Sequence, residues 1–269
     1  MRTIAFRHLL RYFHNRQEFN KINWFKTLEI NFFLFPFSIA IKFPILIYGK
    51  CKLGVLNGTV KFNEIPKKGM LKIGITDPFR SIESTSFVQI QGTIELGSQV
   101  VLRRGLHLVV LGKLSLGNHV YVGDNNAIYV KNNIIIGRGT RIGNNTTIMD
   151  TDFHYIVNTM ENSIKDNNAP IEIGEQNWIG GNCTIKKGTR TPKGTIIAGP
   201  YSMVGKDYTS LIKEYSLMAG SPAKLLIENV RRVNNTESEK VLYEHFKKTT
   251  EQYIIPHDKI ETFCLPTND

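Results

Sequence analysis

The sequence predicts an all-β fold, a solenoid of stacked coils in which short strands alternate with turns. Three observations predict it: aliphatic residues recur at every sixth position, Gly or Asn often follows them, and paired hairpin signals are missing. A period of six fits neither the helical period of about 3.6 residues nor the period of about 2 of one long strand. We therefore expect one aliphatic side chain per strand to point into a narrow core.

Residues 1–83 precede this repeat and form a predicted N-terminal cap region. Residues 30–47 are rich in Phe, Ile and Leu, but Asn31, Pro36, Lys42 and Pro44 interrupt them, so we expect no membrane span. The first 21 residues mix charged residues into their apolar positions and have no signal-peptide core. The region could lie on a membrane surface as a basic, aromatic patch, or cap one end of the solenoid; we favour the cap.

The repeat is clearest where aliphatic–Gly pairs begin three blocks of equal length. Leu96-Gly97, Leu116-Gly117 and Ile136-Gly137 are spaced 20 residues apart. Sixes recur within each block, and strict sixes resume after a gap. The predicted inward positions are Leu96, Leu102, Leu108, Leu116, Val122, Ile128, Ile136, Ile142, Ile148, Ile173, Ile179, Ile185, Thr191, Ile197 and Met203.

An antiparallel sandwich is the alternative fold, but its short strands usually recur every 8 to 12 residues or so, which does not fit regular sixes. We therefore predict one β-helical domain over residues 84–226. Cys183 falls at an inward position of this register and is interpreted as a packing residue rather than a nucleophile.

The repeat breaks once, at residues 149–170, and such a long loop on a compact solenoid needs a reason. The loop carries His154, preceded by Asp150 and Asp152, and either carboxylate could orient an imidazole or simply form the turn. His107 and His119 lie within the coils, where a surface role is expected.

Residues 227–269 follow the repeat as a linker, one short amphipathic helix and an irregular tail. Thr236 and Glu239 form a possible capping box before that helix.

Composition narrows the possible functions. The chain has 34 Lys and Arg against 23 Asp and Glu, a net charge of +11 that would attract polyanions, anionic membranes or phosphorylated small molecules. Because the basic residues are scattered and no nucleic-acid-binding motif is found, we expect no nucleic-acid partner. Cys51, Cys183 and Cys264 are too far apart in sequence for a zinc or iron–sulfur motif, so we expect no metal and a reduced, cytoplasmic setting.

Two segments carry a resemblance to a known family. IEIGEQNWIGGNCTIKKGTRTPKGTIIAG at residues 171–199 and MAGSPAKLL at 218–226 resemble the signature of the hexapeptide-repeat acyltransferases, in their galactoside, maltose and xenobiotic acetyltransferase branch. The N-terminal region resembles the leaders of capsular or exopolysaccharide O-acetyltransferases. The resemblance implies a left-handed parallel β-helix, acetyl-CoA as co-substrate, and a homotrimer that binds CoA between subunits.

The resemblance also implies site residues. His154 would be the catalytic base, since imidazole has an ordinary pKa of about 6.5 and can take a proton from a sugar hydroxyl. The backbone N–H of Gly181 would stabilise the oxyanion. The implied CoA-binding residues are Gly181, Gly199, Gly205, Lys206 and Lys224. Trp178 is a further candidate, which either shields the site and stacks on a substrate or only covers a coil edge. Asn125 and Asp152 are candidates for binding the acceptor, with an ordinary turn role as the alternative for each.

Individual CoA contacts are open because the chain departs from the family pattern. The run before Lys206 is one residue longer than usual, Gly205 replaces a threonine, and Ile227 stands where a basic residue is usual.

These features predict an acetyl-CoA-dependent O-acetyltransferase acting on a sugar of a capsule, lipopolysaccharide or exopolysaccharide. N-acyl transfer to a nucleotide-linked amino sugar and a non-catalytic solenoid scaffold are the alternatives. We expect a cytoplasmic protein, with possible peripheral contact to the inner membrane face through its N-terminal segment.

Overall fold

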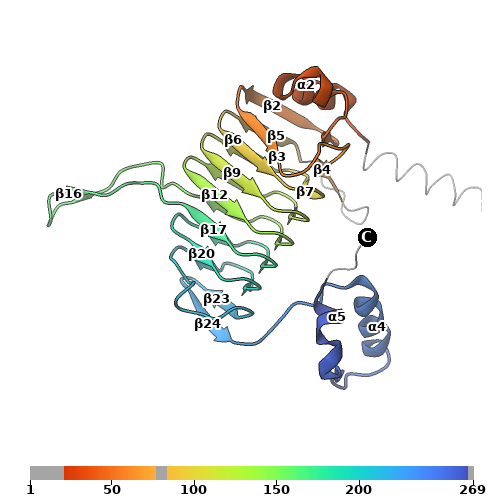
Figure 1. The fold of residues 1–269 in the computed structure, drawn as a ribbon. Coiled ribbons are helices and arrows are strands. Elements are labelled where there is room, and N and C mark those ends of the chain that lie inside the picture. Colours follow the sequence, from red (N-terminus) through yellow and green to blue (C-terminus); the bar gives the residue numbers. More distant parts are fainter. Residues whose placement is uncertain (1–20, 77–83, 266–269) are drawn as a thin grey trace, which may run out of the picture.

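Three sheets form the sides of a prism, and the chain winds round them coil by coil (Figure 1). Their strands pair in parallel, except for the last pair of one sheet, which is antiparallel. The structure is a computed structural model that describes residues 21–76 and 84–265. Residues 1–20, on which the leader prediction falls, lie outside the described residues. The fold is the all-β, left-handed parallel β-helix that the sequence and its resemblance predict.

Each sheet is named here after its first strand. The β1 face contains β1 (Ile45–Ile47), β4 (Leu71–Ile75), β7 (Val100–Arg103), β10 (Tyr121–Val122), β13 (Arg141–Ile142), β18 (Trp178–Ile179), β21 (Ile196–Ile197), β23 (Leu217–Gly220) and β24 (Ala223–Ile227). The β2 face contains β2 (Cys51–Leu56), β5 (Ser86–Ile90), β8 (His107–Val110), β11 (Ala127–Val130), β14 (Thr147–Met149), β19 (Thr184–Ile185) and β22 (Met203–Val204). The β3 face contains β3 (Thr59–Phe62), β6 (Thr93–Leu96), β9 (Lys113–Leu116), β12 (Asn133–Ile136), β17 (Ile171–Ile173) and β20 (Arg190–Thr191).

The core follows the six-residue register of the sequence. Every predicted inward residue from Leu96 to Ile197 is at most 4% exposed. The last prediction, Met203, is wrong: Val204 is buried instead, and it pairs with Ile185. One extra residue between Ile197 and Val204 causes the shift, because a one-residue slip turns a strand's side chains to the opposite face.

The parallel coils begin earlier than the predicted start at residue 84. β1, β2 and β3 pair in parallel with β4, β5 and β6, so the first coil starts at Ile45. These coils were missed because their turns are longer: Leu71 stands opposite Ile45 and Val100 opposite Leu71, spacings that break the sixes.

Two helices, α2 (Trp24–Leu34) and α3 (Phe37–Ala40), cover the end of the first coil (Figure 1). Asn31 is fully buried, and its side-chain amide both donates to the carbonyl of Ile45 (2.7 Å) and accepts from its N–H (3.2 Å). The Thr27 hydroxyl accepts from the N–H of Ile47 at 3.0 Å. Polar helix side chains therefore satisfy the outer edge of β1.

The interruption of the repeat is an arm that projects from the prism (Figure 1). It carries a small antiparallel hairpin, β15 (Val157–Asn158) and β16 (Ser163–Ile164), which the periodicity did not predict. After β24 the chain forms α4 (Thr236–Phe246), a 3₁₀ turn (His257–Lys259) and α5 (Ile260–Cys264). The side chain of Asn235, not Thr236, caps α4 by accepting from the N–H of Ser238, and α5 replaces part of the predicted irregular tail.

Candidate functional site

The base of the arm is fastened by Asp150. This residue is fully buried, and its two carboxylate oxygens accept the backbone N–H groups of Lys131 and Asn132, each at 2.8 Å. Its own carbonyl accepts the N–H of Ala169 at 3.0 Å, which ties the two ends of the arm together. Of the two roles considered for Asp150, the structure shows the structural one.

A ladder of stacked rings on the outside of the β2 face ends at the base of the arm. Phe87, His107, Tyr129 and Phe153 follow one another with ring-centroid distances of 4.9, 5.3 and 5.7 Å. His107 therefore has the surface packing role expected of it. Phe153 is in the arm and directly precedes His154, so the ladder supports the position of the catalytic candidate.

His154 lies beside a cavity of about 240 Å³ between the arm and the prism. The wall includes Asp152 and Lys187, which form an ion pair at 2.8 Å. His154 itself is exposed, and its backbone N–H donates to the carbonyl of Asp152 at 2.7 Å. Within residues 21–76 and 84–265, no hydrogen bond or ion pair holds the imidazole, which leaves both ring nitrogens available to a ligand.

The floor of this cavity contains a buried amide. Asn167 is 2% exposed and lines the cavity, and neither its side-chain nitrogen nor its oxygen has a partner in the described part of the chain. A buried polar group without a partner costs about 1–3 kcal/mol. The periodicity could not reveal Asn167, because it lies in the non-repeating arm.

The turns from the β2 face to the β3 face form one corner of the prism, and the arm leaves the prism there. Gly205 and Lys206 are at this corner, one coil beyond Lys186 and Lys187. A Cβ atom on Gly205 would lie 3.4 Å from that of Lys186. The predicted Gly205-Lys206 pair thus lies at the same corner as His154. Lys187 was missed, although the six-residue register would have placed it there.

The turns from the β1 face to the β2 face form a second corner, which holds the other predicted backbone groups. Gly181 and Gly199 stack on one another, since a Cβ atom on Gly199 would lie 2.4 Å from the carbonyl oxygen of Gly181. A column of backbone hydrogen bonds joins the turns of this corner, including one from the N–H of Asn125 to the carbonyl of Arg104 at 2.8 Å. The predicted site residues that lie in turns are therefore divided between two corners.

Two predicted CoA contacts lie on the β1 face. Trp178 is 41% exposed, and the guanidinium of Arg232 lies 5.1 Å from its ring centroid. Burial, and then the neighbouring charge of Arg141, lower the pKa of Arg232. Lys224 is exposed on β24, at the last turn of the prism. Arg141 and Arg232 were not among the sequence candidates, because Arg232 follows the repeat and only tertiary packing returns it to this face.

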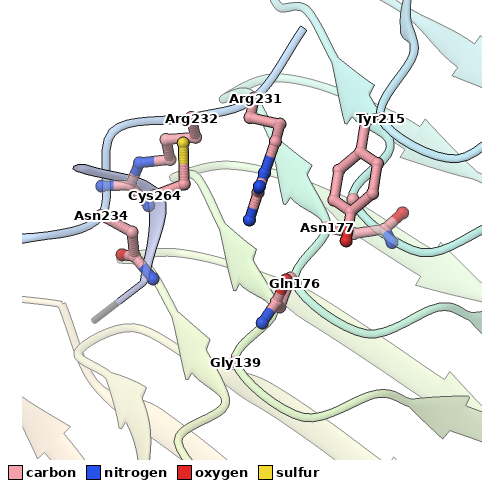
Figure 2. Close-up of a pocket in the computed structure, with 9 residues that line it drawn as sticks. Gly139, Gln176, Asn177, Tyr215, Arg231, Arg232, Asn234 and Cys264 are labelled. Atoms are coloured by element: carbon pink, nitrogen blue, oxygen red, sulfur yellow. The ribbon is translucent and has the colours of Figure 1, made fainter. Parts of the chain in front are cut away.

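Figure 2 shows a second hollow, where the segment after β24 packs against the prism. Its volume is only about 20 Å³, and Gln176, Tyr215 and Arg231 line it. Arg231 already pairs with Glu261 and lies 4.7 Å from the centroid of the Tyr215 ring. This hollow includes none of the predicted site residues and is too small for a substrate.

The cysteines offer no reactive thiolate. Burial raises the pKa of all three thiols, that of Cys51 to about 12. Cys183 is 2% exposed, in agreement with its predicted packing role. Within residues 21–76 and 84–265, no group of three His, Cys, Asp or Glu side chains could hold a metal ion.

Comparison with known proteins bears on the family. A protein of Mycobacterium tuberculosis named as an acetyltransferase is 26% identical over 138 residues, 43% of this chain and 44% of its own length. A protein of Escherichia coli named as a colanic acid biosynthesis acetyltransferase, WcaF, is 27% identical over 141 residues, 51% of this chain and 70% of its own length. The resemblance to acetyltransferases is confirmed. The chain spans less than half of the mycobacterial protein and most of the Escherichia coli one.

No family model matches the chain. Among solved structures, the polySia-specific acetyltransferase NeuO is 19% identical with a TM-score of 0.42, over 80% of this chain and 91% of that one.

Proposed function

We propose that the chain is an acetyl-CoA-dependent O-acetyltransferase that acts on a hydroxyl of a sugar in a capsule, lipopolysaccharide or exopolysaccharide. The observation that carries the proposal is the His154 cavity, which lies at the one break in a β-helix whose sequence is similar to named acetyltransferases. The similarity to a colanic acid biosynthesis protein supports a polysaccharide acceptor.

His154 would act as the general base. A sugar hydroxyl attacks the thioester carbonyl while an imidazole nitrogen of His154 takes its proton. The tetrahedral intermediate then collapses, the carbon–sulfur bond breaks, and the imidazolium returns the proton to the leaving CoA thiolate. Asp152, paired to Lys187 beside the cavity, and Asn167, with its unpartnered amide, are the groups we propose to contact the acceptor.

The proposed oxyanion donor, the N–H of Gly181, lies at a different corner from His154 and does not line the His154 cavity. A single chain therefore leaves the site incomplete. We propose a homotrimer in which the arm of one chain meets the β1/β2 corner of its neighbour, with CoA bound between them. Gly199, Trp178, Lys206 and Lys224 would line the path of CoA, and the two lysines would bind its phosphates. Asn125, at the Gly181 corner, would face the acceptor.

The test is turnover of acetyl-CoA by His154→Ala with a panel of mono-, di- and polysaccharides. We expect the rate to fall by about 10²- to 10⁴-fold, because a positioned general base contributes that much. His119→Asn is the matched control: His119 is exposed in a turn with a positive φ of 60°, a conformation that Asn accepts well. Undiminished turnover by His154→Ala would refute the mechanism.

The chemistry of the product is a separate question from the base. NMR of the isolated product distinguishes an acetyl ester from an amide. We expect the ester. An amide on an amino sugar would still show acyl transfer, but it would contradict the proposal that the acceptor atom is a hydroxyl oxygen.

A further inference from the structure

The cap formed by α2 and α3 is apolar on both sides. Its inner side buries Ile30, Phe35 and Ala40 in the core, together with the polar side chains of Thr27 and Asn31, which bond to β1. Its outer side chains are large, apolar and exposed. They are Trp24 (46%), Phe25 (73%), Leu28 (44%), Phe32 (44%), Phe33 (71%), Phe37 (71%) and Ile41 (48%). We call these seven residues the aromatic cap face.

The terminal unit of a solenoid usually has a polar outer face, because that surface meets water. In this cap the outer face is apolar instead. The rings do not serve to cover the edge of β1, because Thr27 and Asn31 already bond to its backbone. A contiguous exposed apolar patch on a soluble protein commonly marks an interaction site. The aromatic cap face is therefore expected to contact something outside this prism.

Charge around the patch indicates what the partner is. Lys26 and Lys68 place their ammonium groups 5.3 and 5.6 Å from the ring centroids of Phe25 and Trp24. Lys21 and Lys42 are exposed at the two ends of the cap. The acidic residue of α2, Glu29, pairs with Lys26 at 2.6 Å. Aromatic rings bordered by lysines match a membrane interface, where the rings enter the headgroup boundary and the ammonium groups meet anionic lipid.

We propose that the aromatic cap face docks this protein on an anionic membrane surface. Figure 1 places α2 at the end of the prism opposite β23 and β24, so a flat surface can reach it. No helix of residues 21–76 or 84–265 is long and apolar enough to cross a bilayer, so the contact is peripheral. Two copies joined through this face by a twofold axis would bring lysine rim against lysine rim, which is unfavourable. The proposal does not depend on acyl transfer.

The experiment is sedimentation of the full chain with vesicles of phosphatidylcholine, alone or mixed with phosphatidylglycerol. We expect binding to the mixed vesicles that weakens as salt is added. The double variant Phe33→Ser/Phe37→Ser should bind at least about tenfold more weakly, because each ring loses its transfer into the interface. Ile254→Ser is the matched control, since Ile254 is 73% exposed in the C-terminal segment, and it should bind as the parent does.

A second readout follows the cap directly. In a Trp178→Phe background Trp24 is the remaining tryptophan, and its emission should shift to shorter wavelength with the mixed vesicles. Failure to bind anionic vesicles, or equal binding by the serine double variant, would overturn the proposal. So would a change in oligomeric state of that variant without lipid, because it would show that the face joins protein chains. Acetyl transfer to a soluble acceptor by the double variant should remain unchanged.

Discussion

At the scale of single residues, the two aspartates of the arm have different tasks. Asp150 is buried and accepts two backbone N–H groups from the turn of the preceding coil. Asp152 is partly exposed and pairs with Lys187 at the cavity. Asp150, four positions before the catalytic candidate, thus fixes the arm, while Asp152, two positions before it, is available to a ligand.

Replacing Asp150 should therefore destabilise the protein. In Asp150→Ala the N–H groups of Lys131 and Asn132 lose their acceptor, and we expect the free energy of unfolding to fall by about 3 kcal/mol. Asp152→Asn should change it by less than about 1 kcal/mol, because its ion pair is partly solvated. Urea denaturation of the two variants checks this. Equal stability losses would contradict the assignment.

At the scale of elements, the aromatic ladder attaches the base of the arm to the prism. Tyr129 projects from β11 on the β2 face and packs between His107 and Phe153. Because Phe153 directly precedes His154, the packing of Phe153 on Tyr129 fixes the backbone position from which the imidazole projects. The rest of the arm, with its short hairpin, has mostly exposed residues.

Shortening the ladder should loosen the arm without unfolding the prism. Tyr129→Ala removes the middle ring, and we expect faster amide exchange in residues 151–168 and a turnover rate about ten- to a hundredfold lower, since small misplacements of a catalytic group are costly. Tyr129→Phe keeps the ring and should behave as the parent. If Tyr129→Ala exchanges and turns over normally, the ladder does not position the arm.

At the scale of the whole molecule, the candidate site is divided. His154, Lys187 and Lys206 lie at the corner where the arm leaves the prism, whereas Gly181, Gly199 and Asn125 lie at another. A solenoid is rigid, so these groups cannot meet by bending within one chain. Assembly is therefore part of the proposed mechanism.

Mixed assemblies test this directly. His154→Ala lacks the base and Gly181→Pro lacks the backbone donor, so each alone should be inactive. Co-expressed chains should regain activity, because an interface that joins the intact histidine of one variant to the intact glycine of the other is complete. Circular dichroism checks that Gly181→Pro has the parent's β-sheet content. Mixed assemblies without activity would contradict a site shared between chains.

The six-residue period in the sequence by itself determined the class of fold, the inward positions from Leu96 to Ile197 and the one interruption at His154. It could do so because each coil contacts only its neighbours, so a local repeat specifies the packing of a whole prism. Where the period is irregular it was a poorer guide: the first coil at Ile45 was missed, and Val204 replaced Met203.

Only the tertiary structure decided which turns share a corner, that Asp150 fastens the arm, that Asn167 is buried without a partner, and that α2 turns its rings outward. These features depend on contacts between segments far apart in sequence. Such contacts do not recur at a fixed spacing, so the six-residue period cannot predict them. The same reason explains Arg232, whose position over Trp178 arises from a chain that has left the repeat and folded back.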